Sequence, residues 1–351
     1  MTYREPPASK SSVRRAGKAI SEGEAREQDM ALLDQWRMSH GYVLNTFKVW
    51  LRHKIGRFDF DIEFAQRLKR RNTVIDKLQR RDANGVPLIR DVTAMHDLAG
   101  CRIIFRTVDD LNKFREYMHS SKVMKNVDHE LKNEPDRYDY ISSPKFTGYR
   151  GIHDVYKHYP RGSERGDQLK PWDGLMVEIQ YRTRAQHAWA TAVEISDVID
   201  GQRTKFEMNQ SQRGRFFALA SELIARQHEG IATGLPGEST TALIAELRSL
   251  EDRLGILHNL SFLRQAEVQG DFKRHNVLNI TRIEGGQLSL ELYTFDSPSD
   301  AINKATELEA STKSLNAVYV RGDNPKQIRS AYRNYFNDPV DFVALVNSAI
   351  N

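Results

Sequence analysis

The amino-acid sequence predicts an α+β fold followed by a small C-terminal ββαβα module. Strict apolar–polar alternation at Phe58–Phe64 and Val177–Arg182 predicts strands with one buried face. A longer segment with apolar residues at helical spacing, Asp29–Ile55, predicts one or two helices before the first strand. From Asn276 the pattern changes to two short strand-like runs around Gly285-Gly286, which is a hairpin signal and indicates a separate module.

Composition describes a soluble globular protein that favours anionic ligands. The 351 residues suffice for two domains, or for one core domain with additions. Hydrophobic residues make up 39% and charged residues 28%, as is typical of globular chains. The net charge of +5 suits nucleotides or RNA. The single cysteine, Cys101, excludes an intrachain disulfide and is expected to be an inert core residue.

Targeting signals are not found. No segment approaches the roughly 18 consecutive apolar residues of a membrane span. The N-terminal residues are basic but lack the apolar region of a secretory signal. We therefore expect a cytoplasmic location and no membrane association.

A basic corner follows the first predicted strand. Residues 1–28 have little apolar content and predict a mobile basic arm. After the strand come Arg67 and Lys69, and then a short amphipathic helix that carries Lys77. Cations at a strand-to-helix corner suit a polyphosphate, helped by the helix N-terminus. Considered without other evidence, these residues are explained equally well as a solvent-exposed basic segment or as a nucleic-acid-binding surface.

Two acids are candidates for a metal site. Asp97 lies near the end of a predicted short helix and just before Gly100–Phe105, which is typical of a buried central strand. An acid at a strand edge, next to Glu178 from another strand, is a common way to hold Mg²⁺. His96-Asp97 also suggests a metal-dependent HD phosphohydrolase, but the sequence lacks the further His and Asp ligands of that chemistry.

The remaining elements follow from the same patterns. A helix capped by Thr107 or Asp109 precedes a strand or irregular edge. Beyond the second alternating strand, Gly230–Ser239 predicts a linker between helices. The predicted ranges are a helix at 109–118, an edge at 122–131, helices at 188–198, 209–229, 240–268, 299–312, 325–336 and 339–347, and a strand at 317–320.

The stretch Asp139–Trp189 carries most of the candidate chemistry. Glu178, Gln180 and Arg182 alternate on one strand and therefore point to the same side. Upstream, glycines flank Tyr149-Arg150 and allow a sharp turn that presents an aromatic ring among cations, an arrangement that suits a flat base with phosphates. Taken singly, each of these residues is more often structural, so the combination carries the prediction.

These segments resemble the synthetase domain of the RelA/SpoT family, the alarmone synthetases. The resemblance covers about residues 58–200 and has four parts in the family's order. The family usually has Asn where Thr147 stands and Ser where Gly151 stands. The four parts are Arg67-x-Lys69 with Lys77, Asp97–Arg102, Pro144–His153 and Val177–Thr183.

The resemblance implies a fold, a reaction and a role for each matching residue. The fold is a nucleotidyltransferase-like mixed sheet flanked by helices. The reaction is Mg²⁺-dependent transfer of the β,γ-diphosphate of ATP to the 3′-hydroxyl of GDP or GTP, which makes (p)ppGpp. The implied residues are Arg67, Lys69, Lys77, Arg102 and Arg106 for ATP, Asp97 and Glu178 for the metal with Glu178 also as the base, and Lys145, Tyr149, His153, Gln180 and Arg182 for the acceptor.

Four regions are expected along the chain. They are the arm at 1–28, a synthetase domain with N-terminal helices at 29–230, a linker and helix at 231–270, and an accessory or regulatory module at 271–351. A hydrolase domain precedes the synthetase in bifunctional members of the family. Only about 57 residues precede it here, so synthesis without hydrolysis is expected.

Two alternatives remain open. The first is a toxin-like relative that pyrophosphorylates the 3′ end of tRNA or adenosine nucleotides, with the C-terminal module as a neutralising or sensing domain. The altered residues Thr147 and Gly151 motivate it, because both lie beside the implied acceptor pocket. The second is a degenerate synthetase fold that binds RNA without catalysis. The sequence does not decide whether the chain forms a homo-oligomer.

Overall fold

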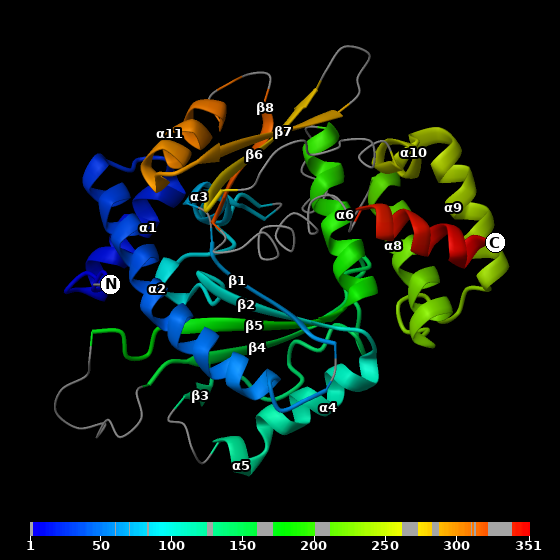
Figure 1. Ribbon diagram of the computed structural model, residues 1–351, viewed down its shortest axis with the longest axis horizontal. Coiled ribbons are helices and arrows are strands. Elements are labelled where there is room, and N and C mark those ends of the chain that lie inside the picture. Colours follow the sequence, from blue (N-terminus) through cyan, green and yellow to red (C-terminus); the bar gives the residue numbers. More distant parts are fainter. Residues whose placement is uncertain are drawn as a thin grey trace. The chain divides into compact units, whose positions relative to one another are not determined.

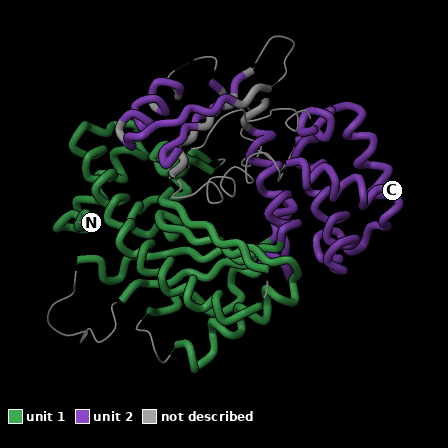
Figure 2. Tube along the Cα trace, viewed as in Figure 1, with its two compact units in different colours: residues 1–139, 151–183 green, residues 140–150, 184–351 purple. Residues whose placement is uncertain are grey.

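The computed structural model divides into two compact units (Figure 2). Unit 1 comprises residues 1–139 and 151–183, and unit 2 comprises residues 140–150 and 184–351. The boundary expected near residue 230 therefore falls inside unit 2. The structure describes residues 3–59, 61–69, 71–82, 84–124, 129–159, 171–200, 211–261, 273–282, 288–309, 311, 314–321 and 339–351.

Unit 1 is built on a five-stranded mixed sheet with the order β1-β2-β5-β4-β3 (Figure 1). The parallel pair β2–β5 lies at its centre, and the other neighbouring strands are antiparallel. This confirms the α+β class and the mixed sheet that the resemblance implies. The strands are β1 Glu63–Leu68, β2 Ala99–Phe105, β3 Glu130–Leu131, β4 Ile152–Lys157 and β5 Met176–Thr183.

Two helices cover one face of this sheet, α2 (Glu27–Ile55) and α4 (Val108–His119). The ring of Phe47 on α2 lies 5.9 Å from that of Tyr156, and the ring of Phe114 on α4 lies 6.4 Å from that of Tyr181. All four rings are fully buried. Because side chains alternate along β5, the even-numbered residues from Glu178 onward point to the opposite face.

The N-terminal residues form a packed helix in place of the expected mobile arm. Helix α1 (Lys10–Glu22) begins after Ser9, whose side chain accepts a hydrogen bond from the Ser12 amide. Val13, Ala16 and Ile20 form one apolar stripe and are buried. Three apolar residues at helical spacing outweigh the polar composition that suggested disorder, because they bury one complete face.

The first strand starts later than predicted. β1 begins at Glu63, while Phe58 packs its ring 5.3 Å from that of Phe114. Arg67 consequently lies in the strand, Lys69 directly follows it, and α3 (Arg71–Gln79) comes next as predicted.

Two further segments differ from the prediction. The helix expected before β2 is only one 3₁₀ turn, η1 (Val92–Ala94), capped by Asp91. The edge expected at 122–131 contains a short helix, α5 (Ser121–Met124), before the two-residue strand β3.

Most of the helices described in unit 2 share one hydrophobic core. Phe217 on α8 and Leu247 on α9 lie in it, together with Phe342 and Val346 of a C-terminal helix at 339–350. This helix was expected to belong to the ββαβα module, but its apolar stripe packs among the other helices. The helices are α6 Arg184–Asp200, α8 Gln212–Ile224, the π-helical turn η2 Ala225–Glu229, α9 Thr240–Leu254 and α10 Ile256–Ser261.

The C-terminal module has a three-stranded antiparallel sheet with the order β7-β6-β8. Val277 and Ala317 of the sheet form a small core with Ala301, Ala305 and Leu308 of α11. The hairpin turn at Gly285-Gly286 and the helix expected at 325–336 lie outside the described residues. The elements are β6 His275–Arg282, β7 Leu288–Phe295, α11 Pro298–Glu309 and β8 Ser314–Arg321.

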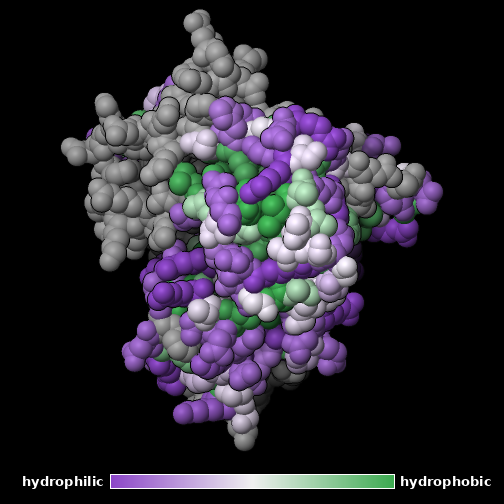
Figure 3. Space-filling model, turned by 90° about the vertical axis from the view of Figure 1, so that its right-hand side faces the viewer, coloured by the Kyte–Doolittle hydropathy of each residue, from purple (hydrophilic) through white to green (hydrophobic). Residues whose placement is uncertain are grey.

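No membrane-spanning helix occurs in the part of the chain that the structure describes. No helix there is both long enough and apolar enough to cross a bilayer. The face shown in Figure 3 is mostly hydrophilic, with hydrophobic residues gathered near its middle.

Candidate active site

The face of the unit 1 sheet opposite α2 and α4 carries aligned polar residues. Glu178 pairs across β5–β2 with Gly100, which pairs in turn with Arg67 of β1. One row further, Gln180 pairs with Arg102 on one side and His153 on the other. Residues directly opposite each other on neighbouring strands point to the same side. The strand register therefore gathers an acid, an amide, an imidazole and two guanidinium groups on one face.

Glu178 is held by its neighbours on this face. The Nδ1 atom of His153 lies 3.0 Å from Oε1 of Glu178, and Nε2 of Gln180 donates to Oε2 at 2.6 Å. Arg182 donates to Oε1 of Gln180 at 3.1 Å and so fixes the amide orientation. Burial opposes ionisation of Glu178, but His153 and Gln180 outweigh it and lower its pKa to about 2. The carboxylate is therefore ionised and oriented.

Two lysines bind the same carboxylate oxygen of Asp97. Lys69 Nζ lies 2.7 Å and Lys77 Nζ 2.9 Å from Oδ2 of Asp97. The backbone amide of Lys69 donates to the carbonyl of Leu98, which fixes this corner beside the start of β2. Burial opposes ionisation, yet the two ammonium groups hold the pKa of Asp97 well below its usual range. Its other oxygen, Oδ1, is buried and has no hydrogen-bond partner among the described residues.

Asp97 and Glu178 lie close enough to interact electrostatically. The charge of Asp97 acts on the pKa of Glu178, in the direction that opposes its ionisation. Both acids also act on His96, whose pKa is lowered mainly by burial and by Lys132. The Nε2 atom of His96 lies 2.6 Å from Lys132 Nζ. The structure thus brings together the two acids predicted as metal ligands, with Lys69 and Lys77 bound to Asp97.

Arg106 does not join this group. It follows the last residue of β2 and is exposed, whereas Asp97 precedes the first residue of the same strand. A seven-residue strand spans roughly 20 Å, so Arg106 lies at the far end from Asp97. Its prediction as an ATP-binding residue is not supported by this geometry.

Two predicted acceptor residues, Lys145 and Tyr149, belong to unit 2. Lys145 Nζ lies 4.3 Å from the ring centre of Tyr140 and 5.4 Å from that of Tyr149. Between them Gly148 has φ +86°, which produces the sharp turn that the sequence suggested. The neighbouring Phe146 is 69% exposed. The loop therefore presents a cation among aromatic rings, as a platform for a phosphorylated base requires.

Sequence reasoning missed the ion pair behind this loop. Arg150 is buried and donates to Oε2 of Glu222 at 2.7 Å, and Glu222 is only 1% exposed. The available signal was Glu222 itself, a lone acid within the apolar run of α8.

The two acids fit one hard cation in part. No cluster of three or more potential metal ligands occurs in the described ranges. Mg²⁺, however, commonly takes only one or two carboxylates and completes its shell with water and substrate phosphates. The unpartnered buried Oδ1 of Asp97 is the kind of oxygen that such an ion uses. Asp97 and Glu178 are therefore the two residues that would hold a magnesium ion, with water and substrate phosphates as its other ligands.

Comparisons with known proteins relate this chain to RelA/SpoT proteins and to a GTP pyrophosphokinase. The family model described as "Region found in RelA / SpoT proteins" matches residues 66–196. GTP pyrophosphokinase YjbM of Bacillus subtilis (strain 168) is 34% identical over 131 residues. The match covers 37% of this chain and 54% of that protein, so the chain spans about half the length of this curated relative.

Solved structures of similar proteins were also found. The small alarmone synthetase 1 from Bacillus subtilis, bound to its product pppGpp, has a TM-score of 0.40 and 24% identity, covering 62% of this chain and 94% of that one. A GTP pyrophosphokinase family protein from Streptococcus pneumoniae has a TM-score of 0.39 and 21% identity, covering 53% and 86%.

Proposed function

We propose that this chain transfers the β,γ-diphosphate of ATP to the 3′-hydroxyl of GDP or GTP, because residues 66–196 match the family model of RelA/SpoT proteins. One observation carries the proposal: a carboxylate fixed by His153 and Gln180 lies within electrostatic reach of Asp97, to which two lysines are bound. The name of the curated relative, a GTP pyrophosphokinase, supports the reaction class.

The basic residues around Asp97 would bind ATP. Lys69 and Lys77 are both bound to Asp97, and a polyphosphate would replace Asp97 as their anionic partner. Arg67 and Arg102 add guanidinium groups on the same sheet face. Phosphoryl transfer depends mainly on alignment and charge neutralisation, and such residues supply both. A magnesium ion held by Asp97 and Glu178 would supply neutralisation of the phosphate charge.

Glu178 would align the acceptor and receive its proton. The acceptor's 3′-oxygen forms a bond to the β-phosphorus of ATP while the bond to the α,β-bridging oxygen breaks. AMP leaves with that electron pair, and the hydroxyl proton goes to Glu178. A carboxylate with a pKa of about 2 is a weak base, so its main contribution is to orient the hydroxyl group. Lys145, Tyr149, His153 and Arg182 are proposed to hold the acceptor.

A polynucleotide acceptor is the second candidate. Phe146, exposed beside Lys145, offers a ring for a further base, and base stacking on aromatic side chains contributes about 1–3 kcal/mol per base. A mononucleotide acceptor has only one base, which Tyr149 would already stack. Of the two acceptors considered for a toxin-like relative, this observation favours the 3′ end of tRNA over adenosine nucleotides.

One transfer assay separates these functions. The protein is incubated with Mg²⁺ and γ-³²P-ATP and, in turn, with GDP, GTP, AMP and tRNA. The γ-phosphate moves within the diphosphate, so the label reports transfer. We expect labelled guanosine nucleotides; labelled tRNA would replace the first function by the second. No labelled acceptor, with ATP binding intact, would leave a non-catalytic RNA-binding fold.

A further inference from the structure

The loop with the proposed acceptor residues rests on a helix outside the RelA/SpoT region. The family model ends at residue 196, whereas α8 begins at Gln212. A Cβ atom at Gly148 would lie 2.9 Å from the Ala218 Cα atom and 3.1 Å from the carbonyl oxygen of Phe217. Only glycine permits such a close approach, and the loop backbone therefore lies directly against α8.

Polar contacts fix this position of the loop. The hydroxyl of Ser221 on α8 donates to the carbonyl of Gly148 at 2.5 Å. The Nε atom of Arg150 donates to the same hydroxyl at 3.3 Å, and its Nη1 atom donates to the Thr233 hydroxyl at 3.0 Å. Both ends of the Gly148–Arg150 turn are thus bound by side chains from later in the chain.

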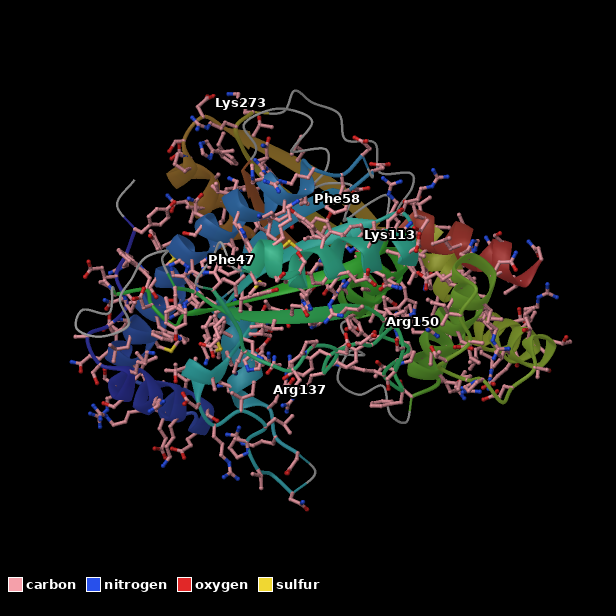
Figure 4. The ribbon with its side chains drawn as sticks, turned by 90° about the horizontal axis from the view of Figure 1, so that it is seen from below. Phe47, Phe58, Lys113, Arg137, Arg150 and Lys273 are labelled. Atoms are coloured by element: carbon pink, nitrogen blue, oxygen red, sulfur yellow. The ribbon has the colours of Figure 1, made fainter. Side chains whose placement is uncertain are left out.

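Glu222 is the centre of these contacts. Its Oε2 accepts from Arg150 and, at 3.0 Å, from the backbone amide of Gly234. Its Oε1 accepts from Arg226 at 2.8 Å. Arg150 and Glu222 are 3% and 1% exposed, and Figure 4 labels Arg150 beside the yellow-green helices of unit 2. Three donors therefore bind this one buried carboxylate, and both of its oxygens are held in place.

We propose that Glu222 is a positioning residue for the acceptor: through Arg150 it holds the 145–150 loop in the shape that presents Lys145 and Tyr149. The inference rests on the proposed function, since it assumes that these two residues bind the acceptor. It extends the functional machinery to α8, which the RelA/SpoT match does not reach.

The test is Glu222→Gln, assayed with GDP as the acceptor, or with tRNA if tRNA is what the transfer assay labels. Glutamine keeps the shape but removes the charge that holds Arg150. We expect the KM for the acceptor to rise by about tenfold, because small displacements of binding groups are costly, while the KM for ATP stays within about twofold. Hydrogen–deuterium exchange of the amides at 145–150 should increase.

Two further variants keep the test decisive. Glu246→Gln removes another acid of unit 2, one that pairs with Arg215 at 2.7 Å but is 40% exposed, and both KM values should stay unchanged. If Glu222→Gln unfolds because Arg150 is left as a buried unpaired charge, the double variant Arg150→Met/Glu222→Met removes both charges. It should fold and still show the raised acceptor KM.

The outcomes distinguish two failures. A wild-type protein that labels no acceptor refutes the proposed function, and the inference falls with it. An active wild type whose Glu222→Gln variant has a lower melting temperature but an unchanged acceptor KM refutes the inference alone, since Glu222 would then be merely structural.

Discussion

At the scale of single residues, Glu178 and Asp97 differ in how their charges are balanced. Glu178 accepts from an imidazole and an amide, so its negative charge is only partly compensated. Asp97 is bound by two ammonium groups, which overcompensate its charge. The surplus positive charge next to Asp97 suits an incoming polyphosphate, whereas the remaining negative charge on Glu178 suits a hydroxyl donor.

Glu178→Gln should lower the rate of diphosphate transfer roughly a hundredfold, because a small misplacement of the attacking hydroxyl group costs a factor of that order. ATP binding should change little, because the phosphate-binding cations remain. The assay is label transfer from γ-³²P-ATP, with nucleotide affinity measured by calorimetry. The control is Glu116→Gln, an exposed acid on α4. Turnover at the wild-type rate would remove Glu178 from the mechanism.

Glu178 should also make stability depend on pH. Its folded-state pKa of about 2 lies below the ordinary value of 4.5, so folding favours the ionised form. The stabilisation, up to about 3 kcal/mol, is complete above pH 4.5 and is lost as the pH falls towards 2. Urea unfolding should therefore show a steeper loss of stability between pH 5 and pH 3 for wild type than for Glu178→Gln. Parallel curves would contradict this pKa.

Residue types predicted the acids and cations of the site, but not their pairing. Lys69 and Asp97 were assigned to different ligands, and only the fold shows that they bind each other. The family resemblance implied Arg106 and Arg102 together as ATP-binding residues. The two ends of a seven-residue strand, however, lie far apart. The sequence alone does not tell which end lies at the functional site.

At the scale of elements, the close fit between the Gly148 turn and α8 predicts an unusual intolerance of a single methyl group. Gly148→Ala should suffer both the left-handed strain, about 1–2 kcal/mol, and an overpacking cost of about 1–3 kcal/mol. Gly255→Ala is the matched control, since φ there is +61° and nothing lies within 4 Å of the added Cβ atom. Thermal unfolding of the two variants separates the contributions. If both variants lost the same stability, α8 would have moved to accommodate the added methyl group at position 148.

Element types were easier to predict than element boundaries. Alternation runs from Phe58 into β1, so the sequence pattern alone fits several start points. The contact of Phe58 with Phe114 removes it from the strand. In α1 the sequence pattern was too weak to predict an element, because only a few apolar residues stand in a polar segment. Packing of these residues against the rest of the unit stabilises the helix.

At the scale of the whole molecule, the last helix belongs to the core of unit 2. Phe342→Ala should destabilise the protein by about 3–5 kcal/mol, because the fully buried ring packs against Phe217 at 5.9 Å. Val343→Ala, at a half-buried position next to it, should cost about 1 kcal/mol or less. Chemical denaturation measures both. Similar small losses would show that this last helix contributes little to stability.

The fold class was predictable, but the division into units was not. Periodicities of two and 3.6 residues identify strands and helices locally. The segment Tyr140–Arg150 nevertheless leaves the unit that surrounds it in sequence, because its glycine and arginine find their partners on α8. Such contacts across about 70 residues leave no periodic signal.

The strand order of unit 1 also bears on how the protein is synthesised. Of the five strands in this sheet, β5 is the last to leave the ribosome, yet it lies between β2 and β4. Until Thr183 has emerged, those two earlier strands each present an unpaired edge to the crowded cell. A nascent chain stalled before Met176 should therefore be a substrate for chaperones and prone to aggregate.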